Sequence, residues 1–250
     1  MGNPFASRAG IIVVGVAIGI MATLLQYFGN PPNMGICVAC MERDIAGALG
    51  LHRAAVVQYL RPEIIGFVIG AFLAALLAKE YRPRGGSAPL VRFFLGVFAM
   101  IGALVFLGCP WRALLRLAGG DWNALTGLAG LATGIGVGVA FLKSGYSLGR
   151  AQPQKAASGI LFPVFMAGLF LLLVFRVTFA EGGPLFFSQK GPGSQFAPVW
   201  MSLGAGVLVG AIAQRSRFCT MGALRDVILL KDFHLMSGVA GLLVAAFAMN

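Results

Sequence analysis

The chain has 250 residues, of which 58% are hydrophobic and only 11% are charged, and its mean hydropathy is +0.87. These values exclude an ordinary soluble globular domain and predict an all-α integral membrane protein. The net charge of +11 does not indicate a nucleic-acid partner, because the cations cluster between apolar segments. Cations in that position are typical of loops that face an anionic cytoplasmic membrane surface.

Apolar segments that could span a lipid bilayer alternate with shorter helix-like pieces. The expected spans, in chain order, are Gly10–Phe28, Ile64–Ala78, Phe93–Leu107, Leu125–Leu142, Ile160–Ala180, Val199–Ala213 and Ser237–Met249. The short pieces are Ile36–Leu49, Pro110–Leu117 and Phe218–Leu230. Several spans hold only about 15 residues, fewer than the roughly 20 that a complete crossing needs. Short spans beside such pieces predict re-entrant helices, which occur where backbone lines a cavity or is buried in protein.

Four residue types recur at a constant separation of 182 positions (for example, 219 minus 37). The pairs are Cys37 with Cys219, Arg43 with Arg225, Asp44 with Asp226 and His52 with His234. The two histidines are the only ones in the chain. This constant offset predicts a repeat whose polar residues are kept in both copies, so the function should lie between the copies. The roles of the histidines stay open.

The cations also predict the topology. Lysines and arginines crowd residues 79–92 and 143–155, and both stretches should be cytoplasmic together with Arg8. Cys37 then follows an outward-running span and Cys219 an inward-running one, which predicts inverted repeats.

The expected division of the chain is a first repeat (1–142), a cytoplasmic linker (143–158), a connecting span with an outer loop (159–197) and the start of the second repeat (198–250). The second repeat is expected to be incomplete, because the counterpart of Cys109 by the same offset falls beyond Asn250. One observation opposes this topology, since Arg43, Arg53 and Arg61 fall on the outer side.

Three of the four cysteines stand where a short helix is expected to begin. Cys37 follows the helix breaker NPPN, Cys109 precedes Pro110, and Cys219 follows a Ser-Arg-Phe stretch. A helix N-terminus favours an anion and a lowered thiol pKa, and a thiol is a soft, weak S–H donor. The three positions together favour a path for a soft anion that contains sulfur or selenium, although any one alone is equally typical of a small buried hydrophobe.

Cys40 completes a Cys-x-x-Cys pair with Cys37, a spacing typical of a redox dithiol or of half a metal site. The second copy has Gly222 at the corresponding position, and no second pair follows. We therefore expect no metal and no cofactor. An intramembrane thiol oxidoreductase that uses Cys37 and Cys40 is the alternative function.

Charged pairs lie inside two otherwise apolar pieces, Arg43–Asp44 in the first copy and Arg225–Asp226 in the second. Ions within a membrane are costly and face a partner or an aqueous cavity. Two interpretations stay open: the arginines attract an anionic substrate, or the pairs bind each other across the axis that relates the copies.

A family resemblance is carried by three segments: GNPPNMGICVACMERDIAGALGLHR, FLGCPWRALLRLAGGDWNALTGLAG and QRSRFCTMGALRD. They resemble the YeeE/YedE family of sulfur-compound transporters, and most of all its YedE-type branch of selenium transporters. The resemblance runs over nearly the whole chain. It implies a permease of the bacterial inner membrane, built from inverted repeats around a narrow path on which single cysteines pass the ion by S–H contacts.

Carried over to this sequence, the path falls on Cys37, Cys109 and Cys219, whereas Cys40 has no counterpart in the thiosulfate-transporting members. The expected substrate is a small selenium or sulfur species such as selenite, selenide or thiosulfate. A soluble sulfur or selenium carrier on the cytoplasmic side is an expected partner.

Overall fold

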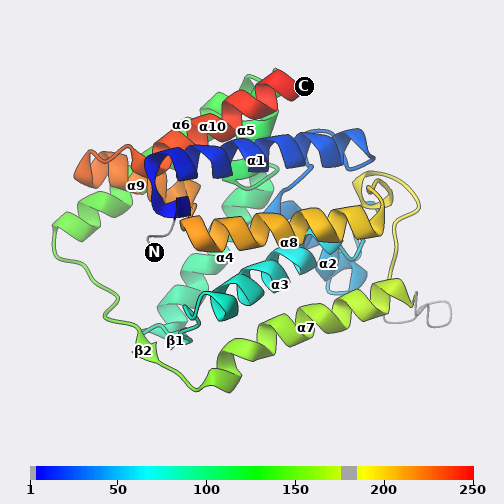
Figure 1. Cartoon of the computed structure of the whole chain (residues 1–250), viewed down its shortest axis with the longest axis horizontal. Helices are drawn as coiled ribbons and strands as arrows, with labels where there is room; N and C mark the ends of the chain where they lie inside the picture. The colour runs from blue at the N-terminus through cyan, green and yellow to red at the C-terminus, as the bar shows by residue number, and fades with distance from the viewer. Residues whose placement is uncertain (1–3, 176–184) are drawn as a thin grey trace.

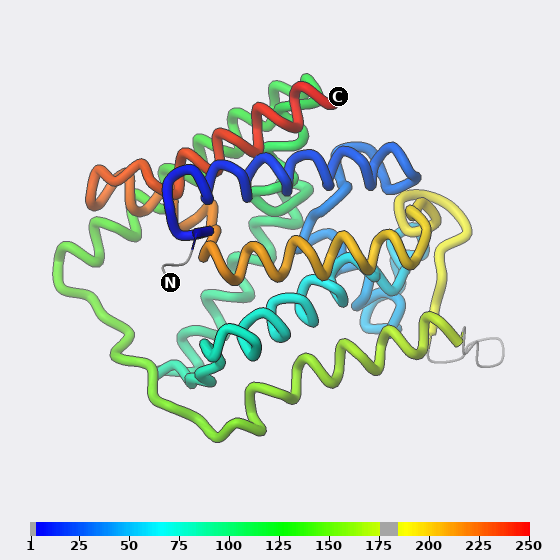
Figure 2. Tube along the Cα trace, in the orientation of Figure 1, coloured from blue at the N-terminus to red at the C-terminus, as the bar shows by residue number. Residues whose placement is uncertain are grey.

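A computed structural model describes residues 4–175 and 185–250, and this part of the chain is mostly helical (Figures 1 and 2). The helices are α1 (Arg8–Tyr27), α2 (Val38–Ala48), α3 (Pro62–Leu77), α4 (Pro89–Val105), α5 (Pro110–Ala118), α6 (Asn123–Lys143), α7 (Ala156–Val174), α8 (Val199–Ser216), α9 (Thr220–Leu230) and α10 (His234–Met249). Short 3₁₀ turns, η1 (Pro4–Ala6) and η2 (Pro192–Ser194), precede α1 and α8.

Each predicted span and each predicted short piece coincides with one of these helices. The predicted span Ile160–Ala180 and the outer loop expected after it extend into residues 176–184, which lie outside the described residues. A prediction of helices alone missed one small feature. Strands β1 (Arg84–Gly85) and β2 (Gln152–Pro153) pair antiparallel and join the cation-rich loop after α3 to the segment before α7.

Four helical stretches are long and apolar enough to cross a membrane by length and composition: Arg8–Tyr27, Pro89–Ala118, Asn123–Lys143 and Ala156–Val174. The helices Pro62–Leu77 and His234–Met249 are apolar but shorter. Helix α4 has no fully buried residue, and α6 buries only Ala124 and Val139. A helical protein that exposes this much apolar surface fits a lipid environment, so the prediction of an all-α membrane protein is confirmed at this level.

Two pairs of helices pack closely along their length, α1 with α10 and α3 with α8. Glycines make this approach possible, because a methyl group on Gly15 would overlap the carbonyl of Gly238, and one on Gly70 would overlap the backbone of Val207. Small residues at helix contacts are the usual means of close packing in membranes. In both pairs the helices run in the same direction, whereas α1 and α8 run in opposite directions (Figure 1).

The main buried core lies between α1, α5, α8, α9 and α10. A second core joins α2, α3 and α7 through residues such as Met41, Ile65 and Leu169. The short helices α2 and α9 lie toward opposite ends of the molecule, on the right and the left of Figure 1. The N-termini of α2 and α5 meet, because their N-caps, Cys37 and Cys109, belong to one buried cluster.

Candidate thiol site

Three cysteines meet in a small buried cluster, which we call the thiol cluster: Cys37, Cys40 and Cys109. Their exposed fractions are 0%, 1% and 8%, so water reaches none of them freely. The Cys37 thiol lies within hydrogen-bonding reach of both Cys40 and Cys109. Apolar side chains, Met34 among them, close the cluster from the sides. The structure thus brings together two of the three expected path cysteines, and it adds Cys40 to them.

Cys37 reaches the cluster because the chain cannot form a helix before it. Pro31 and Pro32 lack backbone N–H donors, and α2 begins only after them. Cys37 is the N-cap of α2 in an extended conformation, and its Sγ accepts a hydrogen bond from the backbone N–H of Cys40 at 3.4 Å. The thiol therefore sits at the positive end of the helix, as the sequence predicts.

Cys109 reaches the cluster through a sharp break between α4 and α5. Leu107 and Gly108 have positive φ angles of 64° and 155°, and Pro110 occupies the first turn of α5. A Cβ atom on Gly108 would lie only 2.6 Å from Cδ of Arg112, so a larger residue would displace that side chain. Cys109 is the N-cap of α5 but makes no side-chain cap bond, which leaves its thiol available to Cys37.

Arg112 is a functional candidate that the sequence analysis missed. Its Nη1 donates to Sγ of Cys40 at 3.1 Å, and its Nε is buried with no hydrogen-bond partner among the described residues. The signal in the sequence is its position three residues after Cys109, on the same face of the first turn of α5. The thiol cluster therefore has a guanidinium group with one unused donor at its edge.

Cys219 lies apart from the thiol cluster. It is the exposed N-cap of α9, and its Sγ accepts from the backbone N–H of Gly222 at 3.2 Å, the same bond that Cys37 forms in α2. A groove of about 370 Å³ between α6 and α9 is lined by Cys219, Met221 and Arg225. Helix α9, which Cys219 caps, lies toward the other end of the molecule from α2 (Figure 1).

A second cavity lies between the thiol cluster and that groove. It has a volume of about 540 Å³ and an apolar lining from α4, α5, α6 and α9. Gly108 and Pro110, the two neighbours of Cys109, line one part of it. Met221 lines both this cavity and the groove of Cys219. Two hollows with a shared lining residue therefore lie along α6, one beside the neighbours of Cys109 and the other lined by Cys219.

Each charged pair binds locally, and neither pair binds the other. Arg43 contacts Asp44 at 2.8 Å, and Arg225 contacts Asp226 at 2.7 Å. The interpretation that the pairs hold the copies together by binding each other is therefore wrong. The neighbouring arginine and aspartate side chains are close enough in sequence to satisfy each other locally.

Asp44 has a second partner, Arg61, which the sequence indicated only as a cation on the unexpected side of the membrane. Arg61 Nη2 lies 2.7 Å from Asp44 Oδ2, and both side chains are fully buried. Arg61 also donates to the carbonyl oxygens of Gln195 at 2.9 Å and Pro192 at 2.7 Å. Arg61 is thus the buried counterion of Asp44 and not a solvated outer cation, which removes part of the conflict with the predicted topology.

The two histidines have different local roles. His52 Nε2 lies 2.9 Å from the carbonyl oxygen of Arg43, and its Nδ1 accepts from the N–H of Ala54, so Nε2 carries the proton. This pair of bonds fixes the chain that leaves α2. The backbone N–H of His234 instead donates to the Asp232 side chain at the start of α10.

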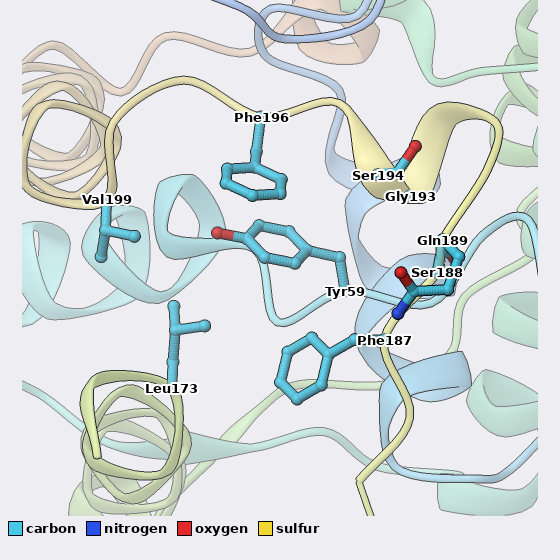
Figure 3. Close-up of a pocket in the computed structure, with 9 residues that line it drawn as sticks. All are labelled: Tyr59, Leu173, Phe187, Ser188, Gln189, Gly193, Ser194, Phe196 and Val199. Atoms are coloured by element: carbon cyan, nitrogen blue, oxygen red, sulfur yellow. The ribbon is translucent and has the colours of Figure 1, made fainter. Parts of the chain in front are cut away.

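A further pocket of about 450 Å³ lies at the end of the molecule that carries η2. Figure 3 shows the ring of Tyr59 between those of Phe187 and Phe196, with Ser188 and Ser194 to one side. Tyr59 and Phe196 stack with ring centroids 4.6 Å apart. The residues that line this pocket include no cysteine, so it is separate from the thiol cluster.

Comparisons of the chain with protein-family models, curated proteins and solved structures find no match. The resemblance to sulfur-compound transporters stays a prediction. Within residues 4–175 and 185–250, no group of three His, Cys, Asp or Glu side chains is placed to hold a metal ion.

Proposed function

We propose that the chain is a membrane permease for a small anion that contains selenium or sulfur, such as selenite, selenide or thiosulfate. The observation that carries this proposal is the burial of three thiols beside Arg112, whose Nε has no partner in the described structure. A buried donor without an acceptor costs about 1–3 kcal/mol, and more when it is charged. A bound anion supplies the missing acceptor and the opposite charge.

The chemistry of the thiol cluster favours a soft anion over a hard one. Thiols are polarizable and weak hydrogen-bond donors, so they compensate poorly for the hydration shell of sulfate or phosphate. A terminal sulfur or selenium atom is less strongly hydrated and makes good dispersion contacts with Sγ atoms. The N-termini of α2 and α5 and the guanidinium of Arg112 provide the positive potential.

The proposed path runs from the thiol cluster to Cys219. The cavity beside Cys109 and the groove beside Cys219 share Met221, whose thioether continues the series of soft sulfur atoms. Arg225 lines the end of the groove, where a soluble sulfur or selenium carrier protein would receive the anion. In this scheme the anion binds first at Cys37, Cys40 and Cys109 and then at a second site beside Cys219.

The permease is proposed to consist of inverted repeats. Support comes from α2 and α9, which have the same length of 11 residues and each begin after a cysteine N-cap. Further support comes from the packing of helices from the two ends of the chain, because α1 packs on α10 and α3 packs on α8. A two-fold axis that relates α1 to α8 and α3 to α10 would produce both pairs, with α2 and α9 as the re-entrant pieces.

The cationic end of the molecule is proposed to face the cytoplasm of a bacterial-type cell. The start of α1, the β1–β2 strands and the end of α8 lie at this end, toward the left of Figure 1. Arg215 binds Glu80 there at 2.8 Å and joins the ends of α3 and α8. The thiol cluster would then lie on the outer half of the path and Cys219 on the inner half.

Uptake by purified protein in liposomes tests this function. We expect radiolabelled thiosulfate or selenite to enter protein-containing liposomes faster than protein-free ones, and each to compete with the other. Excess sulfate or phosphate should compete weakly. The absence of uptake, or equal competition by sulfate, would contradict the proposal.

The contact between Cys37 and Cys40 favours a second candidate, a thiol oxidoreductase. In that reaction the two thiols would form a Cys37–Cys40 disulfide while reducing a substrate disulfide to two thiols, with the protons passing from one pair to the other. Reduction of a disulfide substrate that is lost in Cys40→Ala and retained in Cys109→Ala would support this candidate. The permease requires Cys109 and therefore predicts a different pattern.

A further inference from the structure

Glu63 is a buried acid in the first turn of α3, and the site described above does not use it. Only 1% of its surface is exposed. Its Oε1 accepts a hydrogen bond from Nδ2 of Asn30 at 2.7 Å. Its Oε2 is buried and has no hydrogen-bond partner in the part of the chain that the structure describes.

Among the described residues, no Lys or Arg side chain forms an ion pair with Glu63. The arginines of the neighbouring helices have other contacts: Arg43 of α2 binds Asp44, and Arg112 of α5 donates to Cys40. The backbone of Glu63 contacts α8 at Gly206, and α8 has no charged residue before Arg215, which binds Glu80 at the far end. The segment 28–37 contains no charged residue. In the segment 185–198, Lys190 is exposed to solvent.

The nearest cation along the chain is already occupied. The Arg61 guanidinium lies within bonding distance of Asp44 and of two carbonyl oxygens, at 2.9 Å and 2.7 Å. An ionised Glu63 would therefore be a buried anion with a single neutral donor, which is strongly unfavourable. The neutral acid lacks only an acceptor for its O–H group, which is the smaller cost.

We propose that Glu63 is a proton-binding site that couples proton movement to transport. In this conformation the carboxyl group carries a proton on Oε2. When the path opens and water reaches Glu63, the O–H bond breaks, the proton passes to water and the carboxylate remains, ready to bind a proton again. The coupling rests on the proposed permease function, whereas proton binding by Glu63 does not.

Asn30 provides the link between Glu63 and the thiol cluster. Its Nδ2 also donates to the carbonyl oxygen of Gly35 at 3.0 Å, two residues before Cys37. Its Oδ1 accepts from the N–H of Ala197, just before α8 begins. A change of charge on Glu63 alters the bond to Asn30, and through Asn30 it acts on the segment that positions the Cys37 thiol.

Infrared spectroscopy of the purified protein at neutral pH tests proton binding directly. We expect the wild type to show the C=O band of a protonated carboxyl group, and Glu63→Gln to lose it. The matched control Glu80→Gln, which neutralises an acid that is partly exposed and paired with Arg215, should retain the band. Asn30→Ala should keep the band but shift it, which provides a second reading if Glu63→Gln does not fold.

A pH-sensitive dye inside liposomes tests the coupling. We expect thiosulfate uptake by the wild type and by Glu80→Gln to change the internal pH, and uptake by Glu63→Gln to leave it unchanged. The absence of the carboxyl band in the wild type, or proton movement in Glu63→Gln at the wild-type ratio, would overturn the proposal. A band that Glu63→Gln abolishes, together with no uptake of thiosulfate or selenite by the wild type, would overturn the permease and its coupling but not proton binding.

Discussion

Arg61 and Asp44 form an ion pair in which neither side chain has any exposed surface, with Nη2 of Arg61 2.7 Å from Oδ2 of Asp44. The pair joins the middle of α2 to the residue before α3, and Arg61 extends the connection to the segment 192–195. Because α2 begins at the thiol cluster, this buried pair fixes the helix that carries Cys37 and Cys40. The pair of Arg225 and Asp226 has no such partner among the described residues and is more exposed.

Asp44→Asn should therefore destabilise the protein much more than Asp226→Asn. Removal of one member of a buried ion pair leaves an uncompensated charge and costs about 3–5 kcal/mol. The exposed pair contributes about 0–1 kcal/mol. Chemical or thermal unfolding of the two variants in the same detergent measures the difference. Equal stability of the two variants would show that the buried pair does not hold α2 in place.

The glycine contact between α1 and α10 predicts a second pair of variants. Gly15→Val places a side chain against the carbonyl of Gly238, so the helices must separate and the protein should lose at least about 1–3 kcal/mol of stability. Gly134→Val in α6 adds the same side chain where no atom lies within 4 Å. Size-exclusion profiles and melting temperatures should show damage only in Gly15→Val. Similar damage in both variants would contradict the close packing.

Arg112 should contribute to substrate binding through its unused donor and its charge. Arg112→Gln removes the charge and should weaken thiosulfate or selenite binding about 10- to 100-fold, as expected for a charged hydrogen bond of about 1.5–3 kcal/mol. Arg112→Lys keeps the charge but loses the planar group, so it should recover only part of the affinity. The control is Arg217→Gln, since the Arg217 side chain is 77% exposed. Unchanged binding by Arg112→Gln would remove Arg112 from the site.

The hollows along α6 predict that a side chain can block the path without disturbing the fold. Gly130 lines the cavity beside Cys109, and a Cβ at this position meets no atom within 4 Å. Gly130→Leu should therefore fill the cavity and reduce uptake severalfold, with normal thermal stability. Gly136 also has open space around it but lines neither hollow, so Gly136→Leu should transport normally. If both variants transport normally, the path does not pass along α6.

Hydropathy and breaker residues predict most of the helical elements of this chain. The short helices were predictable because Pro31 and Pro110 mark helix boundaries. In addition, Cys37 and Cys219 are each followed by an arginine, an aspartate and a histidine at the same spacing. Signals of this kind act within a few residues, so they set helix boundaries whatever the tertiary contacts are. They predicted that all three cysteines stand near a helix start, with Cys109 as an N-cap. The structure makes each of the three an N-cap, including Cys219, whereas Ser216, the N-cap expected there, ends α8.

The residues that meet at the thiol cluster could not be predicted in the same way. Cys40 joins Cys109, and Arg112 reaches Cys40, only because α2 and α5 meet across a large separation in sequence. Arg61 was misread for the same reason, since its partner Asp44 is 17 positions away with a loop between them. Hydropathy predicts where helices lie along the sequence, but it does not predict which helices pack against each other.

The loss of uptake in Cys109→Ala tests the central claim most directly. This substitution removes one buried thiol and little volume, so the stability cost should be on the order of 1–2 kcal/mol. The melting temperature, together with alkylation of the exposed Cys219 while the buried Cys37 and Cys40 remain unreactive, verifies that the variant is folded. The proposed permease predicts that radiolabelled thiosulfate and selenite enter Cys109→Ala liposomes no faster than protein-free ones. Uptake by folded Cys109→Ala at the wild-type rate would contradict the claim that the thiol cluster passes the anion.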